Sequence, residues 1–173
     1  FAKFAQVPFL APTNSQEAKD LLLVAFEMSE QFDTPVMLHL TTRISHSKGI
    51  VELGEPQKGP NRKFVKDPGK YVMIPSNARK RHVVVAERLE KLERYAEETP
   101  LNMIESNGAK IGIITGGVSY QYAKEAAPNL NYLRLGLGFP LPMKKIEQFI
   151  KMHERVLIVE ELAHSEKCVC ELT

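Results

Sequence analysis

Apolar side chains recur at helical spacing directly after residues that can begin a helix. Asn14 or Ser15 can cap the first turn, and Glu17 stands three residues beyond Asn14, as in a capping box. The apolar stripe that follows consists of Ala18, Leu21, Leu22, Ala25, Met28 and Phe32. The pattern predicts a helix that ends at about Phe32.

Two short apolar runs flank this helix. The run VPFL at 7–10 and the run from Val36 to Leu40 lie between Pro and polar residues, which is typical of short buried strands. Together with the helix they predict a β-α-β unit. Without a larger parent sheet such a unit has unpaired edges, so we expect it to pack on the second half of the chain or to pair with another copy.

The second half of the chain alternates between strand-like and helix-like patterns. From Ala78 to about Glu98 neither Gly nor Pro interrupts an amphipathic pattern, which predicts a long helix. Strands are predicted at KIGIITGG, NYLRLGLG and RVLIVEE, and helices at VSYQYAKEAA and PMKKIEQFIKM. This alternation predicts an α/β fold, a three-layer sandwich with a parallel-rich mixed sheet, preceded by the partial α/β unit.

A stretch rich in Pro, Gly, Lys and Asn divides the two halves. We predict segments at 1–54, 55–77 and 78–173, the middle one being a linker that can include a hairpin at FVKDPGKYVMIP. Arg79, Arg81 and His82 crowd the first turn of the next helix, where positive charge is unfavourable. We therefore expect acidic neighbours across a domain contact.

Composition narrows the classes of function. A quarter of the residues are charged but the net charge is only +2, which favours neither a nucleic-acid nor a membrane partner. No apolar run approaches the length of a membrane span, and we expect a cytoplasmic protein. Iron–sulfur clusters and structural zinc sites normally take four ligands, whereas this chain has two cysteines, Cys168 and Cys170. We expect ordinary thiols and no metal site, the alternative being a site shared with another chain.

Side chains that can bind an anion follow the second predicted strand. Thr42, Arg43 and His46 offer a hydroxyl, a guanidinium and an imidazole, and ligands of open α/β sheets gather at the carboxyl ends of strands. We predict a site for a carboxylate or phosphate here. The alternative is that Arg43 pairs with a surface Glu and that His46 is solvated.

A weaker phosphate-binding candidate lies between the predicted strand KIGIITGG and the helix after it. Gly116, Gly117 and Ser119 could direct an anion toward the amides of the helix start. Neither a full dinucleotide signature nor a Walker lysine is present. The alternative is a tight turn that needs small residues.

The wording of the sequence also resembles a known family. The strings SQEAKDLLLVAFEMSEQFDTPVML, TTRISHSKGIVELGE, FVKDPGKYVMIPSNARKRH, KIGIITGGVSYQYAKE, NYLRLGLGFPLP and RVLIVEEL resemble the α subunit of indolepyruvate ferredoxin oxidoreductase, of the 2-oxoacid:ferredoxin oxidoreductase family. They occur in the same order up to about Leu162. The resemblance implies a middle fragment: the end of the thiamine pyrimidine-binding domain, then a transketolase C-terminal-like domain.

The resemblance also implies an activity for the parent protein. It implies an enzyme with thiamine diphosphate, Mg²⁺ and [4Fe-4S] clusters that oxidatively decarboxylates aryl pyruvates to acyl-CoA and reduces ferredoxin. Its partners would be a β subunit, ferredoxin, coenzyme A and the 2-oxoacid. The fragment alone is expected to be an inactive scaffold, a homodimer without catalytic residues or bound cofactor. The alternative is an independent nucleotide- or coenzyme A-binding module.

Within this resemblance Arg43, with Thr42 and His46 beside it, would hold the 2-oxoacid carboxylate or a coenzyme phosphate. The basic residues that could meet coenzyme A phosphates, unless they belong to a solvated loop, are Lys58, Arg62, Lys63, Lys66 and Lys70. Three features depart from the family pattern: the tail after Leu162, Gly116 in place of Ser, and His39 where Arg is frequent. We expect His39 to be a core histidine.

Overall fold

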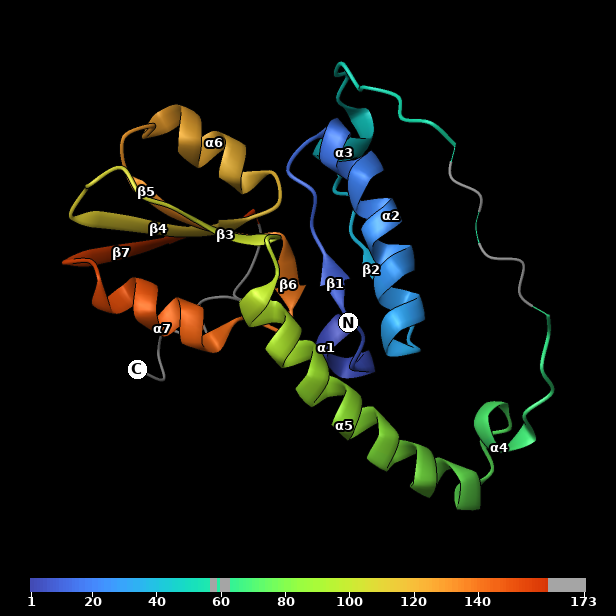
Figure 1. The fold of residues 1–173 in the computed structure, drawn as a ribbon. Coiled ribbons are helices and arrows are strands. Elements are labelled where there is room, and N and C mark those ends of the chain that lie inside the picture. The colour runs from blue at the N-terminus through green and yellow to red at the C-terminus, as the bar shows by residue number, and fades with distance from the viewer. Residues whose placement is uncertain (57–58, 60–62, 162–173) are drawn as a thin grey trace.

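The computed structural model describes residues 1–56, 59 and 63–161. Figure 1 shows two parts. In one, a larger sheet lies between two helices; in the other, a smaller sheet lies beside two long helices. In chain order the elements are α1 (Ala2–Ala5), β1 (Phe9–Leu10), α2 (Ser15–Phe32), β2 (Met37–Leu38), α3 (Thr42–His46), α4 (Pro68–Tyr71), α5 (Pro75–Glu98), β3 (Asn102–Glu105), β4 (Ile111–Gly116), α6 (Ser119–Ala126), β5 (Asn131–Leu135), β6 (Leu137–Phe139), α7 (Met143–Lys151) and β7 (Arg155–Val159).

The larger sheet has the strand order β3-β5-β4-β7. Its central strand β4 is parallel to β5 and to β7, and β3 is antiparallel to β5. Helices α6 and α7 cover opposite faces (Figure 1). Successive residues of β4 serve the two faces, since Ile113 packs with Ala123 of α6 and Ile114 packs with Phe149 of α7. The predicted three-layer sandwich with a parallel-rich mixed sheet is confirmed.

The β-α-β unit is also confirmed, with shorter strands than the sequence predicts. Strand β1 pairs in parallel with β2, and α2 connects them. The Asn14 side chain accepts a hydrogen bond from the Glu17 amide at 2.9 Å. The Glu17 carboxylate in turn accepts from the Thr13 amide at 2.9 Å, so the reciprocal bond reaches one residue before the cap.

The smaller sheet joins the first half of the chain to the second. Strand β1 lies between β2 and β6, and it is antiparallel to β6. The predicted single strand NYLRLGLG is therefore two strands, β5 and β6, which belong to different sheets. They separate at Gly136, where a side-chain Cβ would lie 2.7 Å from the carbonyl oxygen of Leu101. The division at 1–54 and 78–173 stays a prediction, and one sheet takes strands from both segments.

Helix α5 packs the two halves together. It begins at Pro75, about one turn before the predicted start, and its buried residues Leu92 and Ala96 share a core with Leu10, Met28 and Leu137. No pattern in the sequence predicted β3, which follows α5 after three residues. The hairpin prediction is wrong, because the segment before α5 forms the short helix α4, capped by the Asp67 side chain.

The expected acidic neighbour of the basic turn is Asp33, the residue that ends α2. Arg81 lies 3.8 Å from its carboxylate, Lys70 forms an ion pair with the same group, and Arg88 donates to its backbone carbonyl at 2.7 Å. This junction ties the base of α5 to α2.

No helix in the described part is long and apolar enough to cross a membrane. Four residues of the sequence predictions lie outside the described residues: Lys58, Arg62, Cys168 and Cys170.

Candidate functional site

The predicted anion-binding segment folds as a short helix rather than an open loop. Strand β2 ends at Leu38, earlier than the predicted Leu40, and α3 then spans Thr42–His46. Ile44 is the buried residue of this helix and fixes it to the body of the molecule. The side chains of Arg43 and His46, on either side of Ile44, are exposed.

Arg43 is the best placed of the three predicted residues to bind an anion. Its guanidinium carbon lies 5.7 Å from the centroid of the Tyr122 ring on α6, which holds the cation against an aromatic face. Within the described residues Arg43 has no ion pair, so the alternative of a surface Glu partner is not found there. Its hydrogen-bond donors remain free for an anion.

Arg43 opens on a cleft of about 470 Å³, which we call the Arg43 cleft. Lining residues come from the start of α2, from α3 with the turn after it, and from α6: Thr13, Asn14, Ser15, Gln16, Arg43, Ile44, Ser47, Lys48, Gly49, Ile50, Val118 and Tyr122. Arg43 and Lys48 are the charged members, and no carboxylate is among them. The start of α2 adds the positive end of an 18-residue helix, so the cleft favours an anion.

Thr42 lies in a different cleft of about 500 Å³, together with both predicted glycines. This Gly116 cleft is lined by Phe9, Ala11, Pro12, His39, Leu40, Thr41, Thr42, Gly116, Gly117, Leu135, Gly138, Glu160 and Glu161. It lies where β4 and β7 end, a usual place for a ligand in such sheets. Glu160 and Glu161 also line it, so acidic residues are among its members. The structure thus joins Thr42 with the glycines but places Arg43 elsewhere.

Of the other residues singled out in the sequence, His46 and Ser119 line neither cleft, while Gly117 and His39 line the Gly116 cleft. His46 is exposed and borders neither cleft, and Ser119 is buried at the start of α6. Gly117 has φ of 56°, a conformation that favours glycine, so the tight-turn alternative describes its conformation well. His39 is exposed, with its ring 5.3 Å from that of Phe9, and the expectation of a core histidine is wrong.

Sequence reasoning missed a polar network on the α6 face of the larger sheet. Glu105 of β3 accepts hydrogen bonds from the Tyr120 hydroxyl and the Lys124 ammonium, each at 2.6 Å. Arg134 of β5 lies over the Tyr120 ring and pairs with Glu17 of α2 at 2.5 Å. Arg134 and Glu17 are 117 residues apart, so no local pattern could have revealed the pair.

The network shifts the pKa values of Tyr120 and Glu105. Burial, followed by the bond to Glu105, raises the pKa of Tyr120 to about 12. Burial works against the charge on Glu105, but the bonds from Lys124 and Tyr120 outweigh it and keep the pKa of that carboxyl below its ordinary value. Near neutral pH the Glu105 carboxyl is therefore charged and the Tyr120 hydroxyl is protonated and donates to it, so the contact is a structural support on this face of the sheet.

The resemblance implies iron–sulfur clusters and Mg²⁺, which need ligating side chains. They contain no group of three or more His, Cys, Asp or Glu side chains that could hold a metal ion. An iron–sulfur cluster, which normally takes four protein ligands, finds no such set among the described residues.

The fold resembles part of a solved oxidoreductase. The structure resembles the 2-oxoglutarate:ferredoxin oxidoreductase from Magnetococcus marinus, solved with 2-oxoglutarate, coenzyme A and succinyl-CoA bound, at a TM-score of 0.59. The match covers 95% of this chain and 36% of that one at 13% sequence identity, so it bears on the fold alone. The predicted fold class agrees with this neighbour. No family model matches the chain.

Sequence comparison points to a particular group of relatives. The chain is 47% identical to indolepyruvate oxidoreductase subunit IorA of Pyrococcus horikoshii, 44% identical to that of Thermococcus kodakarensis and 39% identical to that of Archaeoglobus fulgidus. The matches cover 93 to 94% of this chain but 27% of each relative. The chain is thus related to the IorA subunits, which confirms the resemblance seen in the sequence, and it spans about a quarter of their length.

Proposed function

We propose that this chain is a segment of a 2-oxoacid:ferredoxin oxidoreductase and that it contributes an anion-binding arginine to that enzyme. The observation that carries the second part is the free guanidinium of Arg43, held against Tyr122 in a cleft that contains Lys48 and no carboxylate. The names of the relatives and the fold of the structural neighbour support the first part.

The proposed reaction is the oxidative decarboxylation of an aryl pyruvate to an acyl-CoA with reduction of ferredoxin. Thiamine diphosphate would supply the carbanion chemistry and [4Fe-4S] clusters would carry the electrons. In this proposal these groups are held by parts of the enzyme outside the described residues. The segment by itself would then be inactive, and the assembled enzyme would include a β subunit.

Arg43 has a defined task in this proposal. Both reactants carry groups that a guanidinium binds through two parallel hydrogen bonds, the carboxylate of the 2-oxoacid and the phosphates of coenzyme A. Arg43 would orient one of them, with Lys48 adding positive charge. Thr42, the first residue of α3, lines the neighbouring cleft. His46 lines neither cleft, so in this proposal it could contact a ligand only on the exposed side of α3.

The Gly116 cleft does not support the alternative of an independent nucleotide-binding module equally well. Gly116 and Gly117 share this cleft with the acidic residues Glu160 and Glu161, whereas the Arg43 cleft is lined by two cations and no carboxylate. Positive charge stabilises a bound anion, so the Arg43 cleft is the better anion site. We therefore favour the oxidoreductase segment.

Steady-state kinetics of the assembled enzyme test the task of Arg43. Arg43→Ala should raise the KM for the 2-oxoacid if the arginine holds its carboxylate, or the KM for coenzyme A if it holds a phosphate, by roughly tenfold or more. The matched control is Arg155→Ala, an exposed arginine at the start of β7. An Arg43→Ala enzyme with both KM values and kcat unchanged would contradict the proposed task.

A further inference from the structure

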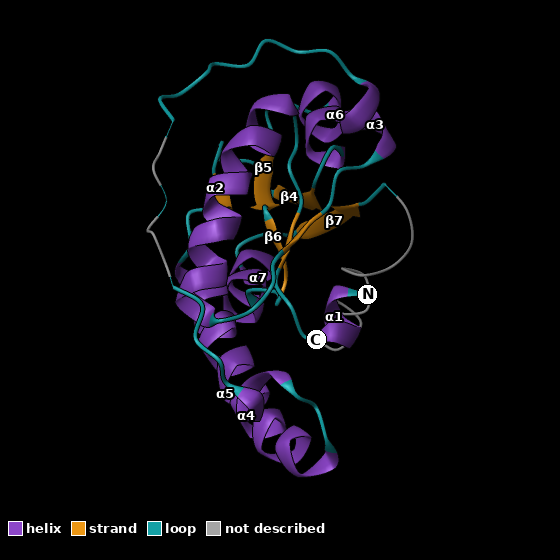
Figure 2. Cartoon of the chain, turned by 90° about the vertical axis from the view of Figure 1, so that its right-hand side faces the viewer, coloured by secondary structure: helices purple, strands orange, loops and turns teal. Residues whose placement is uncertain are grey.

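The chain that follows α3 lies along the start of α2 without forming a helix or a strand. We call residues 48–52 the strap, and three of them, Lys48, Gly49 and Ile50, line the Arg43 cleft. Figures 1 and 2 show the chain leaving α3 at the end of the molecule where α2 begins. The position of Lys48 in the cleft therefore depends on what holds the strap to α2.

Apolar packing does not hold the strap. Ile50 is 97% exposed, and Leu53, the residue just beyond the strap, is 90% exposed. The strap also belongs to neither sheet. A segment with few buried apolar contacts opens at a low free energy unless other bonds fix it.

Two side chains of α2 hold the backbone of Glu52 instead. The Glu52 amide donates a hydrogen bond to Gln16 Oε1 at 2.8 Å, and the Glu52 carbonyl oxygen accepts one from Lys19 Nζ at 2.5 Å. Gln16 and Lys19 are three residues apart, so they lie on the same face of the helix. Both backbone polar groups of Glu52 are therefore bound to α2.

Asp20 orients both of these side chains. Gln16 Nε2 donates to one Asp20 carboxylate oxygen at 2.9 Å, and Lys19 Nζ lies 3.2 Å from the other. The bond from Gln16, followed by the bond from Lys19, lowers the pKa of the Asp20 carboxyl. The carboxylate is therefore charged near neutral pH and keeps both side chains directed at the strap.

Gly49 allows the strap to pass close to α2. A Cβ at this position would lie 3.3 Å from the hydroxyl oxygen of Ser15, the first residue of α2. The strap thus meets α2 at two places, at Gly49 by close approach and at Glu52 by hydrogen bonds. Lys48 stands next to the first of these contacts.

We propose that Gln16 and Lys19 are positioning residues of the Arg43 cleft, which hold the strap at Glu52 and thereby keep Lys48 in place for the anion. This inference rests on the proposed function, in which the cleft binds a carboxylate or phosphate of a reactant. A strap released from α2 would have to be ordered whenever an anion binds, and the lost conformational entropy would weaken binding.

The two residues act through the strap rather than on the anion. Lys19 does not line the cleft, so its loss removes no direct contact there. Gln16 does line the cleft, but its amide oxygen and nitrogen already have Glu52 and Asp20 as partners. Gln16 also carries no charge, so its removal leaves the electrostatic field of the cleft unchanged. Equal effects of the two substitutions would therefore have the strap as their common cause.

Amide hydrogen exchange measured by nuclear magnetic resonance tests the contacts without any ligand. The Glu52 amide should exchange roughly fivefold or more slowly than an unprotected amide of the same sequence. Gln16→Ala and Lys19→Met should each raise its exchange rate by roughly threefold or more. Lys19→Arg, which retains a donor for the Glu52 carbonyl, should preserve the protection. An unprotected Glu52 amide in the wild type overturns the proposal.

Steady-state kinetics of the assembled enzyme test the consequence for binding. Gln16→Ala and Lys19→Met should each raise the KM for the reactant that Arg43 holds by roughly three- to tenfold, with kcat within about twofold of the wild type. Lys19→Arg should restore the KM. In a Lys48→Ala background, Gln16→Ala should change the KM by less than about twofold, because the strap acts through Lys48.

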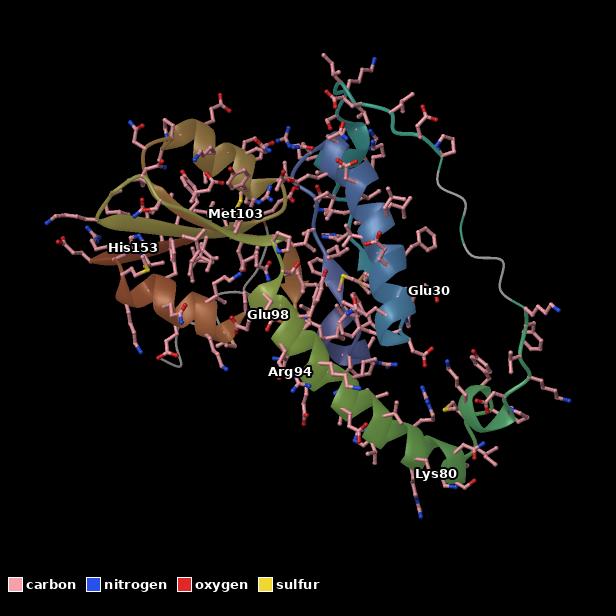
Figure 3. The ribbon with its side chains drawn as sticks, viewed as in Figure 1. Glu30, Lys80, Arg94, Glu98, Met103 and His153 are labelled. Carbon is pink, nitrogen blue, oxygen red and sulfur yellow. The ribbon has the colours of Figure 1, made fainter. Side chains whose placement is uncertain are left out.

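The matched control is Gln31→Ala, an exposed glutamine near the other end of the same helix. Figure 3 shows its neighbour Glu30 at the end of α2 away from α3. Gln31→Ala should leave both the exchange of the Glu52 amide and the KM unchanged.

The contrary outcomes separate this proposal from the proposed function. If Gln16→Ala and Lys19→Met release Glu52 but leave the KM unchanged, while Arg43→Ala raises it, the positioning role is overturned and the proposed function stands. If Arg43→Ala also leaves the KM unchanged, both are overturned. Effects of Gln16→Ala and Lys48→Ala that multiply fully would likewise contradict a role through the strap.

Discussion

The ion pair between Arg134 and Glu17 should couple β5 of the larger sheet energetically to α2. The two groups are 2.5 Å apart, and their side chains are only 18% and 25% exposed. Glu17 also accepts the Thr13 amide, while Arg134 lies 5.5 Å from the centroid of the Tyr120 ring. Breaking the pair with Arg134→Met leaves a largely buried carboxylate with one backbone partner.

The magnitude follows from the geometry. Two unit charges about 4 Å apart attract by about 4 kcal/mol at an effective dielectric constant of about 20. Loss of hydration by both groups, and the solvent that still reaches them, reduce the net value. We expect Arg134→Met and Glu17→Gln each to lower the free energy of unfolding by about 2 kcal/mol, with a coupling energy of about 1–3 kcal/mol between them.

Urea unfolding of the wild type, both single variants and the double variant gives the coupling energy directly. The matched control is the pair between Lys110 and Glu154, which has a similar length of 2.7 Å but side chains that are 78% and 65% exposed. The same cycle with Lys110→Met and Glu154→Gln should give less than about 1 kcal/mol. Additive losses for Arg134 and Glu17, within about 0.5 kcal/mol, would refute the reasoning.

Further predictions concern packing and titration. Gly112→Ala should lower the free energy of unfolding by about 1–3 kcal/mol, since its Cβ would lie 2.6 Å from the buried Phe149 ring, while Gly54→Ala, with nothing within 4 Å, should change it little in urea titrations. Ultraviolet titration should find one phenol with a pKa of about 12 that Tyr120→Phe removes; if every tyrosine titrates near 10, the buried network is wrong. Because the pKa of Glu105 is lowered on folding, its contribution to stability is present above its unfolded pKa and is lost as pH falls through the folded pKa. Glu105→Gln should therefore flatten the acid limb of the stability profile, and an unchanged limb would count against it.

Sequence patterns predicted those elements whose information is local. The capping residues and apolar stripe located α2, and β4, α6, α7 and β7 likewise followed from periodicity and turns. The split between β5 and β6 was missed because it depends on Gly136 packing closely against Leu101, a contact that no local pattern contains. Strand β3 is a four-residue edge strand in which the apolar residues Met103 and Ile104 are exposed. Its sequence therefore lacks the alternation of apolar and polar residues that predicts a strand.

The candidate site was predictable in its chemistry but not in its grouping. The residue types after β2 indicated an anion site, and Arg43 does face a cleft with Lys48. Thr42, its neighbour in sequence, faces another cleft, because α3 is a helix and adjacent residues on a helix point in different directions. Lys48 and Tyr122 were missed, since only the folded chain brings α6 beside α3.

A single-turnover assay of the assembled enzyme tests the central claim most directly. Indolepyruvate-dependent reduction of an artificial electron acceptor would be compared between wild type, Arg43→Ala and the Arg155→Ala control, at equal cofactor content. We expect Arg43→Ala to slow the turnover by roughly 10- to 100-fold at a limiting concentration of whichever reactant it holds, 2-oxoacid or coenzyme A. A rate within about twofold of the wild type for both reactants, with Arg155→Ala equally active, would contradict the claim that this cleft binds a reactant.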